Sequence, residues 1–301
     1  MIREKPVKFE VLGRTRCAVG ESPFWDANNE VLYWVDIPAK QLHCLEKKTG
    51  NQRVLTLPEL VAAAALNTLG GLILVLERRV IIFDPRSEVL ETLCTIEDDA
   101  GNRANDSRVD ASGHLWVGTM QNNIAPDGQG LPVTRSSGSL YRIGLDGCIT
   151  CAYTKLGIPN SLAWSPDNRT MYVADTLENA MFAFHFDLER GLLTERRRFP
   201  DRAPGFPDGS CVDHSGFIWN ARWGGSCLAR FSPEGRLERV VELPVTNPTS
   251  CTFDGSDNNT LYVTSATHGL DANALAANPL EGALLAVDVG VSGPAARAFG
   301  G

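Results

Sequence analysis

A turn followed by a strand rich in aromatic and β-branched residues recurs along this chain, and this recurrence restricts its fold more than any other feature. Asp, Asn and Gly occupy the turns, as is typical of β-hairpin tips. The copies lie at residues 25–34, 67–75, 110–117, 165–173, 213–219 and 254–263, the second being degenerate. Their spacing of about 40 to 55 residues suits a four-stranded propeller blade and is too long for a leucine-rich repeat. The sequence therefore predicts an all-β protein, a six-bladed β-propeller with four-stranded blades around a central channel.

Weaker hairpin signals lie between these copies and predict the outer strands of the blades. Two examples are residues 139–143 and 228–231. Helical periodicity is nearly absent, and the one exception, residues 271–280, predicts only a turn or two of helix. Residues 7–12 are expected to pair with strands that follow Leu284, because an unclosed sheet edge favours aggregation.

Composition and charge indicate a soluble globular domain and argue against nucleic acid or anionic membranes as partners. The 43% hydrophobic content suits a sizeable core, and we expect residues 1–301 to form one domain. The net charge of -8, with no basic run longer than residues 196–198, predicts that the protein binds neither nucleic acid nor an anionic membrane. The N-terminus leads into no apolar signal region, so a cytoplasmic location is expected. Eight cysteines without a framework predict free thiols.

Four polar clusters stand at corresponding places, each just before the aromatic strand of a repeat. They are residues 20–23, 102–106, 157–161 and 207–210. Any one of them alone is typical of the Asx, Gly and Pro residues that form turns at the start of a strand. If the loops entering the inner strands open onto one end of the channel, however, the side chains of all four face the same small volume. Glu21, Asn160 and Asp208 then offer three oxygen ligands, which suit a hard divalent cation such as Ca²⁺, Mg²⁺ or Mn²⁺, and carboxylates also bind Zn²⁺.

Other catalytic motifs are absent from the sequence. There is no G-x-S-x-G nucleophile elbow, no P-loop, no G-x-G-x-x-G after a strand and no H-E-x-x-H. The five histidines lack paired spacing, so an imidazole-rich zinc site is not expected.

The chain resembles the SMP-30/gluconolactonase/regucalcin family in motifs that span nearly its whole length. The motifs are Gly20-Glu21-Ser22-Pro23-x-Trp25, Asn105-Asp106-x-x-Val109-Asp110 leading to Gly118-Thr119-Met120, Pro159-Asn160-Ser161-Leu162-Ala163-Trp164-Ser165, and Pro207-Asp208-Gly209-x-x-Val212-Asp213. The resemblance implies a six-bladed propeller with one divalent metal ion (Ca, Zn, Mn or Mg) that hydrolyses sugar-acid lactones. It places the metal ligands at Glu21, Asn160 and Asp208. It places substrate contacts at Arg103 and Asn105.

The chain departs from the family pattern at two points. Gln121, with two asparagines after it, follows Gly-Thr-Met where some members carry acidic residues, and Ser161 stands where Gly is common. We expect Gln121 to contact the substrate. With Arg103 retained, the loss of negative charge favours an anionic aldarolactone over a neutral aldonolactone. The long polar stretch from 122 to 137 either borders the pocket or is a solvent-exposed insertion.

The expected reaction is hydrolysis of a sugar-acid lactone to the open-chain acid, with the metal polarising the carbonyl and Asp208 acting as the base. Arg103 and Asn105 would orient the substrate. Two alternatives stay open: a metal-dependent esterase or phosphotriesterase-like hydrolase, and a non-catalytic calcium-binding propeller. The expected partner is a small sugar lactone, and the protein is expected to be a monomer or a weak homo-oligomer.

Overall fold

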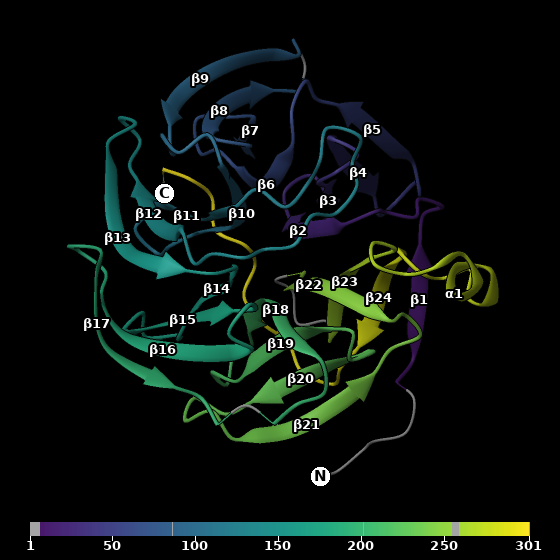
Figure 1. Cartoon of the computed structure of the whole chain (residues 1–301). Coiled ribbons are helices and arrows are strands. Elements are labelled where there is room, and N and C mark those ends of the chain that lie inside the picture. The colour runs from purple at the N-terminus through teal and green to yellow at the C-terminus, as the bar shows by residue number, and fades with distance from the viewer. Residues whose placement is uncertain (1–6, 86, 201, 255–258, 301) are drawn as a thin grey trace.

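A computed structural model, describing residues 7–85, 87–200, 202–254 and 259–300, shows six four-stranded antiparallel sheets arranged as a ring (Figure 1). The predicted six-bladed β-propeller is confirmed. The first three blades contain β2 (Gly20–Asp26), β3 (Val31–Asp36), β4 (Gln41–Glu46), β5 (Gln52–Thr56), β6 (Val61–Leu66), β7 (Leu72–Leu76), β8 (Arg79–Asp84), β9 (Val89–Thr95), β10 (Asn102–Val109), β11 (Leu115–Gln121), β12 (Gly138–Ile143) and β13 (Ile149–Leu156). The next two contain β14 (Pro159–Trp164), β15 (Thr170–Asp175), β16 (Ala180–Asp187), β17 (Leu192–Arg198), β18 (Phe206–Val212), β19 (Ile218–Trp223), β20 (Cys227–Phe231) and β21 (Leu237–Glu242).

The sixth blade joins the two ends of the chain and closes the ring. Its strands follow the order β1 (Phe9–Leu12), β24 (Leu284–Asp288), β23 (Thr260–Ala266) and β22 (Asn247–Phe253). The N-terminal strand β1 pairs antiparallel with β24, with Phe9 opposite Val287 and Leu12 opposite Leu284. This confirms the predicted pairing of residues 7–12 with a strand after Leu284, which covers the outer edge of the last sheet.

One short helix, α1 (Ala272–Ala277), lies where the sequence predicted a turn or two of helix. The Asp271 side chain caps it by accepting a hydrogen bond from the Ala274 backbone N–H at 2.8 Å. Within the part of the chain that the structure describes, no helix has the length and apolarity needed to cross a membrane.

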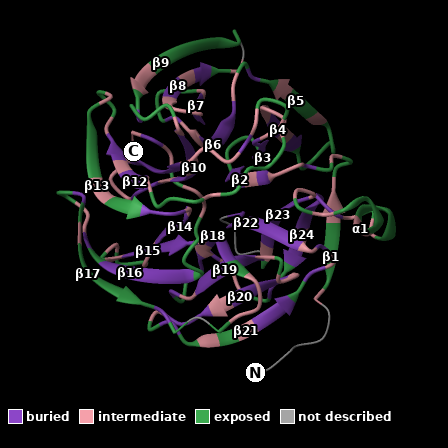
Figure 2. Ribbon diagram, in the orientation of Figure 1, coloured by how far each residue is buried: buried purple, intermediate pink, exposed green. Residues whose placement is uncertain are grey.

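Apolar side chains fill the spaces between neighbouring blades. Trp219 and Leu228 of the fifth blade, for example, pack in one cluster with Leu261 and Leu285 of the sixth. Burial falls from the channel outward, as Figure 2 shows: β22 is buried throughout, whereas the outer strands β9 and β17 are mostly exposed. The inner strands therefore form the rigid part of the ring.

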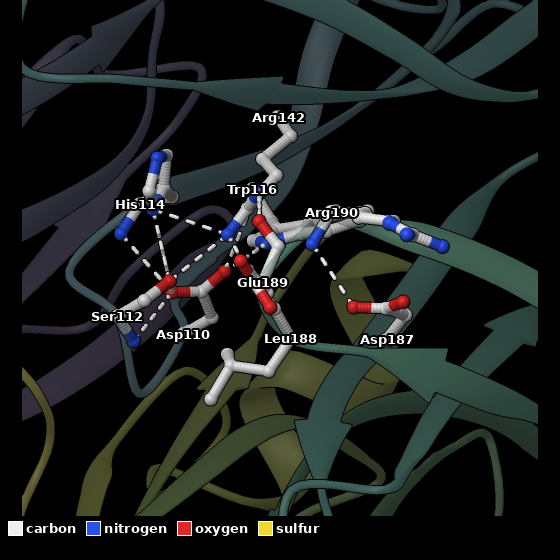
Figure 3. A network of polar contacts seen from close by, with 9 residues as sticks. All are labelled: Asp110, Ser112, His114, Trp116, Arg142, Asp187, Leu188, Glu189 and Arg190. Atoms are coloured by element: carbon white, nitrogen blue, oxygen red, sulfur yellow. Dashed lines mark hydrogen bonds and ion pairs between the residues drawn. The ribbon is translucent and has the colours of Figure 1, made fainter.

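The recurring turn of the sequence is held by a buried aspartate. In the third blade, Asp110 Oδ1 accepts hydrogen bonds from the backbone of Ser112 and His114, and Oδ2 accepts from Trp116 Nε1 at 2.8 Å (Figure 3). The Arg142 guanidinium on β12 pairs with the same carboxylate at 3.2 Å. One carboxylate thus joins a turn, an interblade tryptophan and a neighbouring strand.

The fifth blade repeats this arrangement in full. Asp213 accepts from the backbone of Ser215 and Phe217, from Trp219 Nε1 at 3.0 Å, and from Arg230 at 2.6 Å. The shared pattern Asp-x-Ser-Gly-x-x-Trp in the two blades is therefore a structural motif and not part of a reaction site.

The cysteines are free, as expected: all eight occur as thiols. Residues 255–258, the tip of the repeat at 254–263, lie outside the described residues.

Candidate functional site

A β-bulge interrupts the inner strand of every blade, and the predicted site residues lie at these bulges. The pairing shifts register between Glu21 and Phe24, between Ala104 and Ser107, between Asn160 and Ala163, and between Pro207 and Ser210. A bulge changes the direction in which side chains point along a strand. Side chains early on these inner strands thus face one end of the channel, and those later on the strands face the other.

Two buried aspartates fix the loops that enter the inner strands of the first and fourth blades. Asp36, at the end of β3, accepts from the backbone N–H groups of Ala18 and Val19 at 2.8 and 3.1 Å, and thereby holds the approach to Glu21. Asp175, at the end of β15, accepts from Gly157 and Ile158 at 2.7 and 3.0 Å, and holds the approach to Asn160 in the same way. These contacts place two of the proposed ligands before any metal binds.

A cavity of about 200 Å³ opens at the channel end where the inner strands begin. It brings together the predicted residues Glu21, Arg103, Asn105, Asn160 and Asp208. Its other walls are largely apolar or aromatic, and are formed by Val19, Ile37, Met120, Ile124, Ile158, Trp223 and His268. A few convergent polar groups in an apolar pocket are the usual composition of a small-molecule site.

The charge balance of this cavity suits a divalent cation. Burial, together with the charge on Asp106, raises the pKa of Glu21 to about 8. Burial first, and then the charges on Glu21 and Asp106, raise the pKa of Asp208 well above its ordinary value. Two carboxylates that disfavour each other's ionisation in a poorly solvated place are stabilised by a cation between them. The donor set of two carboxylates and one amide oxygen therefore fits a hard metal ion.

Carboxylates and imidazoles alone do not complete such a site. Within the described ranges, no group of three or more His, Cys, Asp or Glu side chains lies close enough to hold a metal. The Asn160 amide oxygen lies at the same cavity and is available as a third protein ligand.

Neighbouring side chains orient the Asn160 amide. Its Nδ2 donates to Thr176 Oγ1 at 2.8 Å, and the Thr176 hydroxyl in turn donates to the Pro207 carbonyl at 2.6 Å. The opposite atom, Oδ1, accepts from Asn105 Nδ2 at 2.9 Å. With one lone pair used in this way, Oδ1 keeps a second for a metal ion.

A fully buried polar network supports Asp208 from behind. The Asn220 side chain donates to the Asp208 carbonyl at 2.8 Å and to the hydroxyls of Ser161 and Ser210 at 3.0 Å each. Ser161 also hydrogen-bonds the Asp208 carbonyl. Arg222 donates to Asn220 Oδ1 at 2.9 Å and fixes the orientation of that amide. The network spans β14, β18 and β19 and holds the backbone of Asp208 in place.

Ser161, the residue that departs from the family pattern, adopts a left-handed backbone conformation with φ of 61°. This conformation favours glycine, which accounts for Gly being common at the position. Here the hydroxyl contributes three buried hydrogen bonds that a glycine would lack.

Arg103 is buried and organises the opposite wall. It donates from Nε and Nη2 to Asn123 Oδ1 at 3.1 and 2.7 Å, and from Nη1 to Asn105 Oδ1 at 3.0 Å and the Ala104 carbonyl at 2.7 Å. These contacts within the described residues use four of its five N–H groups. Burial lowers the pKa of Arg103 to about 10, so it stays cationic at neutral pH.

Gln121 is not among the residues that line the cavity. Its Oε1 instead accepts from the backbone N–H groups of Thr134 and Arg135 at 2.9 and 3.1 Å. Gln121 thus closes the base of the 122–137 loop. That loop borders the pocket through Asn123 and Ile124, whereas most of residues 126–136 are exposed to solvent, so each of the two alternatives describes part of this stretch.

Sequence reasoning missed several residues that build the site. Asn123, Thr176, Trp223 and His268 line the cavity, and Asp36 and Asp175 hold its loops. The two aspartates could have been found from the sequence, because each ends the second strand of its repeat. The others lie in loops or at strand ends, where only the folded ring brings them to the cavity.

Comparison with known proteins agrees with this geometry. Residues 19–267 match the family of SMP-30/gluconolactonase/LRE-like regions. The chain is similar to regucalcin of Gallus gallus (33% identity over 300 residues, 98% of this chain and 99% of the relative). It is equally similar to 6-deoxy-6-sulfogluconolactonase of Pseudomonas putida (33% identity over 293 residues, 96% and 97%). A solved structure, the calcium-binding protein regucalcin of Agrobacterium tumefaciens, superposes with a TM-score of 0.91 at 31% identity over 99% of both chains.

Proposed function

This chain belongs to the SMP-30/gluconolactonase family, and on that premise we propose that it hydrolyses a sugar-acid lactone with the help of one divalent cation. The observation that carries the proposal is the meeting of Glu21, Asn160 and Asp208 at one cavity that Arg103 and Asn105 also line. A propeller that served only as a scaffold would not need two buried carboxylates and an oriented amide around a single pocket.

Glu21, Asn160 and Asp208 would hold the cation, with Ca²⁺, Mg²⁺ and Mn²⁺ favoured by oxygen donors and Zn²⁺ also compatible with the carboxylates. When bound, such an ion polarises a carbonyl oxygen and lowers the pKa of a coordinated water. The aliphatic walls formed by Ile37 and Ile158 limit bulk water around the reacting groups.

Asp208 acts as the base in this proposal. Its carboxylate takes a proton from the attacking water and returns it to the ring oxygen as the lactone opens, a role that typically contributes 10²–10⁴-fold. Burial raises the pKa of Asp208 well above its ordinary value, which makes its carboxylate a stronger base than an exposed aspartate. The Asn220 and Ser161 contacts to its backbone keep the carboxylate aimed at the pocket.

Arg103 and Asn105 orient the substrate. Arg103 has one Nη2 N–H left for a substrate oxygen, and Asn105 Oδ1 has one lone pair left for a substrate hydroxyl. The guanidinium also lies where negative charge develops on the opening lactone. We further propose that Gln121 affects substrate preference through the 122–137 loop, since its side chain anchors that loop.

The cation on Arg103 favours an anionic lactone, such as an aldarolactone, over a neutral aldonolactone. The substrate is then a small soluble molecule, handled in the cytoplasm by a monomer or weakly associated oligomer. The P. putida relative, whose name specifies a sulfonated lactone, is consistent with an anionic group in this family's substrates.

The test is acid release from neutral and carboxylated sugar lactones by metal-stripped protein, with Ca²⁺, Mn²⁺, Mg²⁺ or Zn²⁺ restored singly. We expect turnover only with metal, and a larger loss from Asp208→Asn than from Arg103→Ala. Asp127→Asn, on the exposed loop, is the matched control and should leave turnover unchanged. A phosphotriester panel covers the main enzymatic alternative. Metal binding without hydrolysis of any lactone or phosphotriester would instead favour a calcium-binding propeller.

A further inference from the structure

A second cavity of about 290 Å³ lies at the opposite end of the channel. It is lined by Ser22, Ser107, Leu162 and Ser210, which lie within or after the bulges. The strand residues that line the metal cavity lie earlier on the same inner strands, before or within the bulges. The two cavities therefore share the inner strands but open at different ends.

Arg108 on β10 is the central charge of this second cavity. Its guanidinium donates only to main-chain carbonyls, those of Pro23, Ser210 and Cys251, at 3.4, 3.3 and 3.0 Å. Among the described residues, it forms no ion pair within 4.0 Å. Charges shielded from water are normally paired, so a half-buried guanidinium that bonds three carbonyls and lines a cavity marks a place for an anion.

No carboxylate of the described residues pairs with Arg108. Asp213, which also lines the cavity, is instead paired with Arg230 at 2.6 Å. Asp106 is occupied by backbone N–H groups, accepting from Ser107 at 2.8 Å and from Leu162 at 3.2 Å. Glu21 faces the metal cavity. Both carboxylates feel the Arg108 charge, but each lies beyond ion-pair distance from it.

The C-terminal segment covers this end of the ring. Ser292 accepts a hydrogen bond from the His214 backbone N–H at 3.0 Å, and the Phe299 backbone donates to Leu66 at 2.8 Å. Between these anchors the chain crosses the channel, as the yellow trace in Figure 1 shows. Pro294, Ala295 and Ala296 add an apolar wall, and exposed Arg297 stands at the rim.

We propose that this cavity binds a small organic carboxylate, with Arg108 on the anionic group and the apolar wall on its hydrocarbon part. The hydroxyls of Ser22 and Ser107 lie among the lining residues and can donate to the same oxygens. A guanidinium binds a planar carboxylate better than a spherical ion, because two N–H groups can reach both oxygens. Phe24, Leu162 and Ala296 give an alkyl group apolar surface that an inorganic ion cannot use.

The experiment is isothermal titration of the folded, metal-free protein with isobutyrate in chloride-free buffer, followed by titrations with chloride and inorganic phosphate. Arg108→Met removes the charge at similar length. Ala296→Trp fills the cavity from the C-terminal segment and leaves Arg108 in place, so it serves as the second variant if Arg108→Met does not fold. Arg103→Met removes the cation of the metal cavity, and Arg135→Met, on the exposed loop, is the matched surface control.

We expect one isobutyrate site with a dissociation constant in the millimolar range or tighter. Its affinity should fall at least about tenfold in Ala296→Trp and in any folded Arg108→Met, and should change less than twofold in Arg103→Met and Arg135→Met. Binding lost only in Arg103→Met would place the anion in the metal cavity and overturn the proposal. Chloride or phosphate binding as tight as isobutyrate, unaffected by Ala296→Trp, would overturn the carboxylate assignment. Absence of isobutyrate binding up to about 50 mM would overturn the site itself.

Discussion

Removing the metal should make the stability of this protein fall as pH rises from 6.5 to 8. The pKa of Glu21 is raised to about 8 in the fold, mainly by burial, from its ordinary value of 4.5. The folded state therefore holds a proton that the unfolded state has already lost across this window. Stability is greatest where Glu21 is protonated in both states, and it declines as pH rises through the folded pKa. Asp208, whose pKa is raised for the same reason, acts in the same direction.

The size of the effect follows from the shift. One proton of difference changes the unfolding free energy by about 1.4 kcal/mol per pH unit. Because the folded pKa is near 8, this slope becomes smaller as the pH approaches 8. Glu21 alone then lowers the unfolding free energy by about 1.6 kcal/mol between pH 6.5 and 8, which corresponds to a Tm about 3 °C lower for a chain of this size. Burial lowers the pKa of His43, which makes the stability rise with pH. This rise falls mainly below the ordinary His pKa of 6.5, so it adds little between pH 6.5 and 8.

The assay is thermal and denaturant unfolding of metal-free protein at several pH values, repeated with excess Ca²⁺. Glu21→Gln removes the titrating group at nearly constant shape, so metal-free Glu21→Gln should be more stable than the unmodified protein at pH 8 and should show a flatter profile. Bound Ca²⁺ should reverse the trend, because ligand carboxylates must be ionised to bind it. Asp127→Asn is the matched control. If the metal-free protein is as stable at pH 8 as at 6.5, or if Glu21→Gln leaves the slope unchanged, then the carboxylates do not share a poorly solvated site.

Two further predictions concern the buried networks. Asn220→Ala leaves the Asp208 carbonyl and two serine hydroxyls short of a donor, so it should destabilise the fold by about 1–3 kcal/mol and reduce kcat more than it raises KM. Denaturant unfolding and lactone turnover measure this, and an unchanged kcat in a destabilised variant would limit Asn220 to a structural role. Asp110→Asn and Asp213→Asn should lower stability by similar amounts, on the order of 3 kcal/mol, without affecting turnover at a permissive temperature. A large difference between the two in unfolding experiments would refute the equivalence of the two blades.

The ring and most of the site were predictable because both depend on local patterns. Turn residues followed by aromatic strands mark each blade, and Glu21, Asn160 and Asp208 occupy equivalent positions within it. Gln121 shows where such reasoning stops. Adjacency to Gly-Thr-Met suggests a substrate contact, but the amide accepts two backbone hydrogen bonds from a loop thirteen and fourteen residues later. No sequence pattern predicts that pairing. No pattern predicts the positions of Trp223 and His268 either, because they reach the cavity only when the ring closes.

The bulges explain how one set of strands can serve two cavities. A regular strand would alternate its side chains across the blade, whereas an extra residue at the bulge turns the chain so that Glu21 faces one end of the channel and Ser22 the other. Ser22 and Ser161 occupy these bulges with φ of 48° and 61°, conformations that cost non-glycine residues about 1–2 kcal/mol. The strain persists because the buried hydrogen bonds of Ser161 offset it. Replacing a bulge residue therefore disturbs both ends of the channel together, and effects of such variants on metal binding and on anion binding should be correlated.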